Sequence, residues 1–206
     1  MGTSSAPTTA ASLIHRPDSW VDRLPLQSLF QIQQSIEVEL GSGDGSFMVQ
    51  WAALRPERNF LAVERLLGRL RKLDRKAQRA GLRNLRLMRI EAAYFLEYLL
   101  PLQSVTALHL YFPDPWPKRK HRRHRLVNDR FPELIARVLQ PEGVCYLRTD
   151  DTDYFAQMLE VFQGDNRFTA IETPPELAAV ITDFERGFQQ RGIPTQRAAY
   201  QLRLSR

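Results

Sequence analysis

The sequence predicts an α/β fold: a mostly parallel, doubly wound sheet with a C-terminal antiparallel strand pair. Three observations support this prediction. Short β-type runs alternate with helical patterns from residue 36 onward, a glycine-rich turn follows the first run, and an acidic residue stands at the carboxyl end of every run. Strands that alternate with helices of this length pair in parallel through right-handed crossovers.

Length and composition agree with one domain. The 206 residues are 43% hydrophobic and 25% charged, which is ordinary for a globular protein. We expect a disordered tail over residues 1–17 and a single domain over residues 18–206. Cys145 is the only cysteine, which excludes an internal disulfide and a Cys-based zinc site and suits the cytoplasm. Because no apolar run could span a membrane and the four histidines lack metal-ligand spacing, we expect no membrane partner and no metal.

The elements are expected in the following order. After an irregular segment over residues 19–34, β-type runs fall at 36–40, 59–63, 85–89, 105–112 and 143–148. Helical patterns lie at about 46–54, 66–80, 92–99, 129–138 and 152–163. Residues 169–172 and 198–204 are predicted to form the antiparallel pair, with a loop over residues 173–196 between them.

A glycine-rich turn closes the first strand, with the sequence Glu39-Leu40-Gly41-Ser42-Gly43-Asp44-Gly45. Glycines let the backbone turn tightly and approach a ligand closely. A dinucleotide site needs a glycine where this chain has Ser46, which argues against a nicotinamide-dependent dehydrogenase. By itself, the turn could also be purely structural.

Four further acids follow the later strands: Glu64, Glu91, Asp114 and Asp150. Ligands of open α/β sheets bind along this edge, and an acid after the second strand accepts hydrogen bonds from ribose hydroxyls. Packing does not explain an acid at the end of every strand. Any one of them could instead cap a helix, and this alternative stays open for Glu91 in particular.

The net charge of +6 comes from one segment, which we call the basic octet. Residues 118–125 read Lys-Arg-Lys-His-Arg-Arg-His-Arg. They hold six of the 29 Lys and Arg residues, so the remaining 23 equal the 23 acidic residues. Such a run repels itself unless a polyanion binds, and the lack of an accompanying apolar face favours nucleic acid over a membrane. A second basic stretch, residues 65–89, is interpreted as a solvated helix face.

The segment 111–118 reads Tyr-Phe-Pro-Asp-Pro-Trp-Pro-Lys. Its three prolines stiffen the loop around Asp114, and Trp116 offers a flat ring on which a base can stack. With the octet directly after it, this tryptophan–proline loop has the parts of a site that presents a nucleobase to a reactive cofactor. The alternative is a proline-rich surface turn with Trp116 in the core.

On these motifs the chain resembles the bacterial tRNA (guanine-N7-)-methyltransferases from about Leu24 to the C-terminus. The shared motifs are the glycine turn, Ala62-Val63-Glu64, Phe112-Pro113-Asp114-Pro115-Trp116 with its basic tail, Thr149-Asp150 and Thr182-Asp183-Phe184-Glu185. The resemblance implies a Rossmann-like fold that depends on S-adenosyl-L-methionine (SAM), with tRNA as partner. It implies no obligate protein partner, and we expect a monomer or homodimer. The chain departs from the family at Glu91, where Asp is usual, and at His124, where Arg is common.

The resemblance also implies a role for each site residue. The residues expected to bind SAM are Glu39, Gly41, Gly43, Glu64, Glu91 and Asp114. Those expected to contact the substrate are Lys118, Asp150, Thr182, Asp183, Phe184 and Glu185, although Thr182 and Glu185 also match a capping box. Those expected to contact RNA are Lys120, His121, Arg122, Arg123, His124 and Arg125.

The implied reaction is methyl transfer from SAM to N7 of a guanine in the tRNA variable loop. N7 already carries an in-plane lone pair, so the reaction needs alignment rather than a general base. We predict Asp114 as the catalytic residue, because a carboxylate stabilises the positive charge that develops on the base. An exocyclic-amine methyltransferase is disfavoured because a second proline after Pro115 is missing. A non-catalytic RNA-binding protein is disfavoured by the complete set of strand-end acids.

Overall fold

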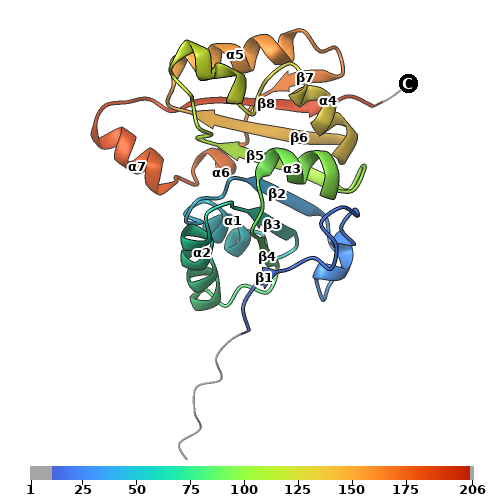
Figure 1. Cartoon of the computed structure of the whole chain (residues 1–206). Coiled ribbons are helices and arrows are strands. Elements are labelled where there is room, and N and C mark those ends of the chain that lie inside the picture. The colour runs from blue at the N-terminus through green and yellow to red at the C-terminus, as the bar shows by residue number, and fades with distance from the viewer. Residues whose placement is uncertain (1–10, 205–206) are drawn as a thin grey trace, which may run out of the picture.

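The computed structural model describes residues 11–204, which form one eight-stranded sheet with helices on both faces (Figure 1). The strands lie in the order β1-β4-β3-β2-β5-β6-β8-β7. All neighbouring pairs from β1 to β6 are parallel, whereas β8 runs antiparallel to both β6 and β7. The predicted fold class is therefore confirmed, including the antiparallel pair.

The strands lie close to the predicted positions. They are β1 Ile14–His15, β2 Ile36–Leu40, β3 Asn59–Val63, β4 Leu85–Met88, β5 Val105–Tyr111, β6 Leu139–Thr149, β7 Phe168–Ile171 and β8 Gln196–Leu202. The α-helices are α1 Met48–Leu54, α2 Leu67–Arg79, α3 Ala92–Tyr94, α4 Phe131–Val138, α5 Thr152–Gln163, α6 Pro175–Ala178 and α7 Asp183–Gln190. A π-helix, η2 Phe95–Leu99, continues α3, and two 3-10 helices are η1 Leu26–Leu29 and η3 Arg119–His124.

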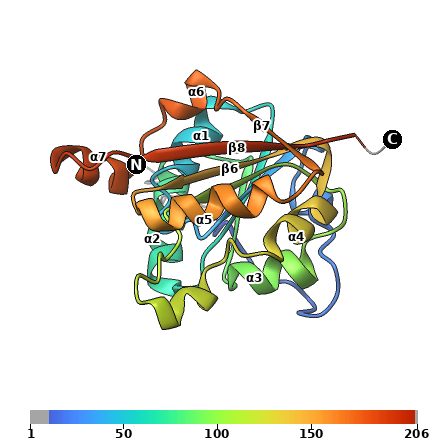
Figure 2. The same ribbon diagram turned by 90° about the horizontal axis from the view of Figure 1, so that it is seen from above.

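Each face of the sheet is covered by its own set of helices. The buried side chains of η2, α4 and α5 form one apolar cluster with the sheet, represented by Phe95, Phe131 and Tyr154. Those of α1, α2 and α6 form the other, represented by Trp51 and Leu70. Figure 2 shows α3, α4 and α5 on one side of β6 and β8, and α1 and α6 on the other. A sheet covered on both faces explains why β2 and β3 are buried along their whole length.

Three stretches differ from expectation. Residues 14–15 pair in parallel with β4, so the expected disordered tail over residues 1–17 does not hold for residues 11–17; residues 1–10 lie outside the described part of the chain. The expected loop over residues 173–196 contains α6 and α7. Strand β6 begins earlier than predicted and passes through a register shift against β5, with Glu142 at φ 63°. Strand β1 has only two residues and the start of β6 is irregular, so neither shows enough alternation of apolar and polar residues to be predicted from the sequence.

The parallel strands end together at one edge of the sheet, and this edge carries the residues singled out above. The loops after β2, β3, β4, β5 and β6 hold the glycine turn and the strand-end acids. In the described residues 11–204, no helix is both long and apolar enough to cross a membrane. Within the same range, no three His, Cys, Asp or Glu side chains gather as a metal site would require.

Candidate active site

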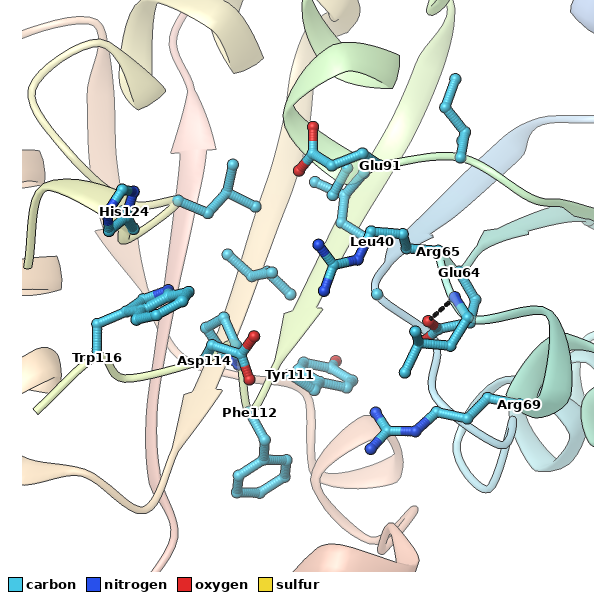
Figure 3. A pocket seen from close by; sticks show the side chains of 17 residues that line it. Leu40, Glu64, Arg65, Arg69, Glu91, Tyr111, Phe112, Asp114, Trp116 and His124 are labelled. Atoms are coloured by element: carbon cyan, nitrogen blue, oxygen red, sulfur yellow. Dashed lines mark hydrogen bonds between the residues drawn. The ribbon is translucent and has the colours of Figure 1, made fainter. Parts of the chain in front are cut away.

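A cavity of about 370 Å³ opens at the carboxyl ends of β2, β3, β4 and β5. Its volume lies in the range of small-molecule sites. Figure 3 shows Trp116 and His124 on one side of the cavity, Glu64 and Arg69 on the other, and Asp114 between them. One continuous space therefore connects the glycine turn with the tryptophan–proline loop.

The glycine turn forms part of the cavity wall. Gly41 and Gly43 have φ angles of 77° and 56°, which favour glycine, and a Cβ on either would meet no atom within 4 Å. A side chain there would project into open space beside the cavity. At Gly45, φ is 80° and a Cβ would lie 2.1 Å from Cδ1 of Leu73 on α2. The first two glycines leave room for a ligand, whereas the third lets α2 pack closely.

Glu64 joins the glycine turn to the start of α2. Its Oε2 accepts a hydrogen bond from the backbone N–H of Gly43 at 2.9 Å, and its Oε1 accepts one from the N–H of Leu66 at 2.7 Å. A carboxylate has about four acceptor positions, so two further donors can bind. Glu64 can therefore hold the loop in shape and still accept hydrogen bonds from a ligand in the cavity.

Strand β2 contains two buried acids in very different surroundings. Glu37 accepts hydrogen bonds from Trp51 and Arg58 and contacts His109, and these partners outweigh the effect of burial and lower its pKa to about 2. Glu39 is 3% exposed, and its Oε2 has no hydrogen-bond partner. Burial raises the pKa of Glu39 to about 8, although the positive charge of Arg148 opposes this shift. An unpartnered buried carboxylate directly before the glycine turn is typical of a binding site rather than of a packed core.

Glu91 lies at the cavity wall and also caps α3. Its two carboxylate oxygens accept hydrogen bonds from the backbone N–H groups of Ala93 and Tyr94, at 2.9 and 2.8 Å. The capping alternative is therefore present in the structure. It does not exclude ligand binding, because acceptor positions on both oxygens remain.

The tryptophan–proline loop places Asp114 at the cavity with its side chain exposed. Phe112 and Trp116 flank it with φ angles of 52° and 45°, a conformation that non-glycine residues rarely adopt. Trp116 is 37% exposed, and its ring lies 5.1 Å from that of His124. The alternative of a tryptophan buried in the core is therefore excluded. Backbone strain on both sides of one carboxylate is typical of a functional loop.

The basic octet divides into exposed and buried members. Most of it forms η3, whose Lys and Arg side chains are exposed and follow Lys118. Arg125 differs, since it is 2% exposed. Its guanidinium donates to the carbonyl of Pro115 at 2.7 Å, to Gln157 at 2.8 Å and to Asp153 at 2.6 Å. Arg125 therefore anchors the tryptophan–proline loop to α5, which sequence spacing did not indicate.

The segment 182–185 is both a helix cap and an ion-pair centre. Thr182 and Glu185 form a complete capping box at the start of α7. Glu185 is fully buried, and its carboxylate also accepts hydrogen bonds from Arg148 at 2.9 Å and from Arg197 at 2.8 Å. Phe184 is exposed, with its ring 6.2 Å from that of Phe112. This segment therefore lies against the tryptophan–proline loop, with Phe184 as its exposed aromatic group.

Three site residues remain to be placed. Asp150 is half-buried directly after β6, at the same sheet edge as the cavity. Asp183 is exposed and forms ion pairs with Lys76 at 3.6 Å and Arg186 at 2.6 Å. Lys118 is exposed at the N-terminal end of η3.

Two charged residues that line the cavity were not identified as site residues by sequence reasoning. Arg65 and Arg69, at the start of α2, contribute to its wall. They were interpreted as part of a solvated helix face. A signal was available, because a residue that directly follows a strand-end acid must lie at the carboxyl edge of the sheet.

Comparison with known proteins supports one fold class. A family model described as "Putative methyltransferase" matches residues 33–198. Among solved structures, the 16S rRNA methyltransferase KamB has a TM-score of 0.60 at 17% identity, covering 87% of this chain and 91% of its own. An rRNA methylase from Streptococcus thermophilus has a TM-score of 0.57 at 18% identity, covering 83% and 88%. The fold and the family model together define a Rossmann-like methyltransferase.

Relatives with similar sequences identify the family to which the chain belongs within this class. The tRNA (guanine-N(7)-)-methyltransferase of Rubrobacter xylanophilus is 35% identical over 90% of this chain and 84% of its own length. That of Halorhodospira halophila is 34% identical over 87% and 80%. The match to that of Syntrophotalea carbinolica, at 37% identity, covers 68% of this chain and 60% of the relative. The chain belongs to the tRNA (guanine-N(7)-)-methyltransferase family.

Proposed function

We propose that this protein transfers the methyl group of SAM to N7 of a guanine in the variable loop of tRNA. The observation that carries the proposal is the single cavity shared by the glycine turn and the tryptophan–proline loop. Cofactor and base would meet there, beside the exposed cations of η3. We further propose that the enzyme acts in the cytoplasm without an obligate protein partner, as a monomer or homodimer.

The residues of the cavity fit a SAM molecule. Gly41 and Gly43 leave open space, Glu64 and Glu91 have free acceptor positions, and the unpartnered Oε2 of Glu39 lies directly before the turn. Acids in these positions suit the hydroxyl and N–H donors of a nucleoside cofactor. When bound, SAM supplies an electrophilic methyl group on a positively charged sulfur.

Asp114 provides the group that the base needs. N7 attacks through its own lone pair, so the residues at the site have to orient the base and exclude other geometries. As the new N–C bond forms, positive charge develops on the guanine ring, and a carboxylate held nearby stabilises it. The strained, proline-rich loop fixes Asp114 before the substrate arrives.

The surrounding residues would hold the flipped-out base and its strand. Trp116 offers an exposed ring for stacking, and Phe184 lies beside Phe112 at the start of the same loop. Lys118, Asp150, Thr182 and Asp183 are proposed substrate contacts at this edge. The exposed residues of η3, Lys120 to His124, are proposed to contact phosphates. Arg125 and Glu185 are themselves buried and ion-paired, with Asp153 and Arg148 respectively, which supports a role in positioning these groups.

An Asp114→Asn variant tests this proposal. The assay incubates protein with unmodified tRNA and methyl-labelled SAM and identifies the labelled nucleoside after digestion. Asp129→Asn, at an exposed acid outside the cavity, is the matched control. We expect 7-methylguanosine from the wild type and the control, and a loss of about 10²-fold or more from Asp114→Asn with tRNA binding retained. Unchanged turnover would overturn the role of Asp114, and label in another nucleoside would overturn the proposed reaction.

A further inference from the structure

Helix α2 presents a row of cations that the site described above does not use. The exposed basic residues on it or directly before it are Arg65, Arg69, Arg71, Lys72, Arg75 and Arg79. Among the described residues, none of these six lies in an ion pair within 4 Å. Lys76 is the exception on this helix, since it pairs with Asp44 at 2.7 Å. The row therefore carries positive charge that the fold does not neutralise.

The cations share one face because of their spacing. At 3.6 residues per turn, Arg69, Lys72 and Arg79 fall within one stripe along the helix, and Arg65, two residues before the helix begins, lines the same cavity as Arg69. Leu70, Leu73 and Ala77 form a separate stripe, about 110° around the helix, that is buried in the core. We call the exposed stripe, together with Arg65 and the adjacent Arg71 and Arg75, the α2 basic face.

This face begins at the cavity. Arg65 and Arg69 line the cavity on the side opposite Trp116 and His124 (Figure 3). On one side of the cavity, Trp116 is followed in the sequence by the basic octet, which includes His124. On the other side, Arg65 and Arg69 belong to the α2 basic face. In Figures 1 and 2, α2 and the yellow-green segment of residues 119–124 both lie on the left side of the molecule, and α2 lies below that segment in Figure 1. Two cationic surfaces thus flank one cavity.

Like charges spaced four residues apart on a helix repel one another and weaken it. The fold gains nothing from this arrangement, whereas a polyanion along the face would relieve the repulsion and release counterions. A membrane surface fits poorly, because the apolar side of α2 is buried in the core and not available for lipid. A nucleic acid backbone is the polyanion that also has a base to place in the cavity.

We propose that the α2 basic face is a second phosphate-binding surface, which holds the same RNA on the opposite side of the cavity from the octet. This inference rests on the proposed function. An RNA whose reactive base lies in the cavity would have its backbone leave on both sides, and each side would meet cations. The octet would then position one flank of the reactive nucleotide, and α2 the other.

The test uses a double variant and a charge-matched control. Lys72→Gln with Arg79→Gln removes two charges from the α2 basic face and leaves the cavity-lining Arg65 and Arg69 intact. Arg137→Gln with Arg203→Gln removes two exposed charges near the other edge of the sheet, where β5 and β6 begin. Gln is nearly as good a helix former as Lys or Arg, and the equivalent Ala double variant repeats the test with higher helix propensity.

The measurement is tRNA affinity as a function of salt concentration, with SAM binding measured alongside. We expect the α2 variant to bind tRNA roughly tenfold or more weakly at 0.05 M salt. The slope of log Kd against log salt should fall by about 1.4 to 1.8, as the loss of two phosphate contacts implies. The α2 variant should bind SAM as tightly as the wild type does. The control variant should bind both tRNA and SAM as tightly as the wild type does. Equal weakening in both double variants, or unchanged affinity in the α2 variant, would overturn the inference.

The two proposals fail separately. If the wild type methylates guanine N7 but tRNA binding does not depend on α2, the proposed function stands and the second surface is refuted. If tRNA binding depends on α2 but label appears elsewhere than N7, the surface stands and the reaction is refuted.

Discussion

Glu39 should make the cofactor-free protein less stable as the pH rises. Its carboxyl lies 3% exposed on β2 with an unpartnered oxygen, and burial raises its pKa to about 8 from an ordinary value of 4.5. Arg148 on β6 lowers this pKa, whereas Glu64 after β3 and Asp44 in the glycine turn raise it further. A Glu39→Gln variant keeps the shape of the side chain and removes its ionisation.

The size of the effect follows from the pKa. Below pH 4.5 the carboxyl is protonated in both the folded and the unfolded state, and it adds no pH dependence. Between pH 4.5 and about 8 the unfolded chain has released the proton and the folded protein has not, so the free energy of unfolding falls by about 1.4 kcal/mol per pH unit. The loss levels off near 5 kcal/mol above pH 8. A chain of this length has an unfolding entropy of about 0.4 kcal/mol/K, so this loss of free energy lowers Tm by about 10 °C.

The assay compares Tm for wild type and Glu39→Gln between pH 5 and pH 9 without SAM. We expect the variant to gain about 8 to 10 °C relative to the wild type over this range. Glu160→Gln, at an exposed acid on α5, controls for the general effect of removing a carboxylate. A difference in Tm that stays constant from pH 5 to pH 9 would refute the reasoning. Since SAM carries positive charge, its addition should stabilise the wild type most at high pH.

Two further predictions concern the loops around the cavity. Gly45→Ala should lower the free energy of unfolding by about 2 to 4 kcal/mol in urea, because its Cβ would meet Leu73 at 2.1 Å, whereas Gly43→Ala should cost only about 1 kcal/mol. Equal losses would show that α2 does not pack against the turn as described. Arg125→Gln should speed hydrogen exchange of residues 113–124 by roughly tenfold or more while leaving the amides of α2 unchanged, since it removes the hydrogen bonds to Pro115 and Asp153. Unchanged exchange in the loop would rule out Arg125 as its anchor.

The parallel part of the fold is predictable because it depends on local patterns. The β-type runs at 36–40 and 59–63 are strands with those bounds. Residues 60–63 form a continuous apolar segment, as a sheet buried on both faces favours, whereas in 36–40 three apolar residues alternate with the buried Glu37 and Glu39. The sequence predicts a loop where α6 and α7 lie, although Thr182 and Glu185 match a capping box. The apolar residues of α7 do not mark a core-facing side, because the exposed Phe184 and the half-buried Phe188 both pack near Phe112 of the tryptophan–proline loop instead of entering the core.

The site was predictable as a set of residues but not as a set of contacts. Strand-end acids can be identified from spacing, because parallel strands end at one edge. Two contacts become visible only in the folded structure. Glu91 caps α3, and Arg125 is buried. The guanidinium of Arg125 is covered by α5, whose Asp153 is 28 residues away in the sequence. No property of the octet itself distinguishes this arginine from its exposed neighbours.

The position of β8 has a consequence for how the chain is made. β8 follows every other described strand in the sequence, yet in the sheet it separates β6 from β7. A ribosome therefore exposes β6 with one edge unpaired, and β7 with no partner at all, until residues 196–202 emerge. An open edge on a newly made sheet invites pairing with another chain. The protein's yield in the cell should therefore be sensitive to the speed of translation from β6 through β8, more than to the speed at which the first five strands are synthesised.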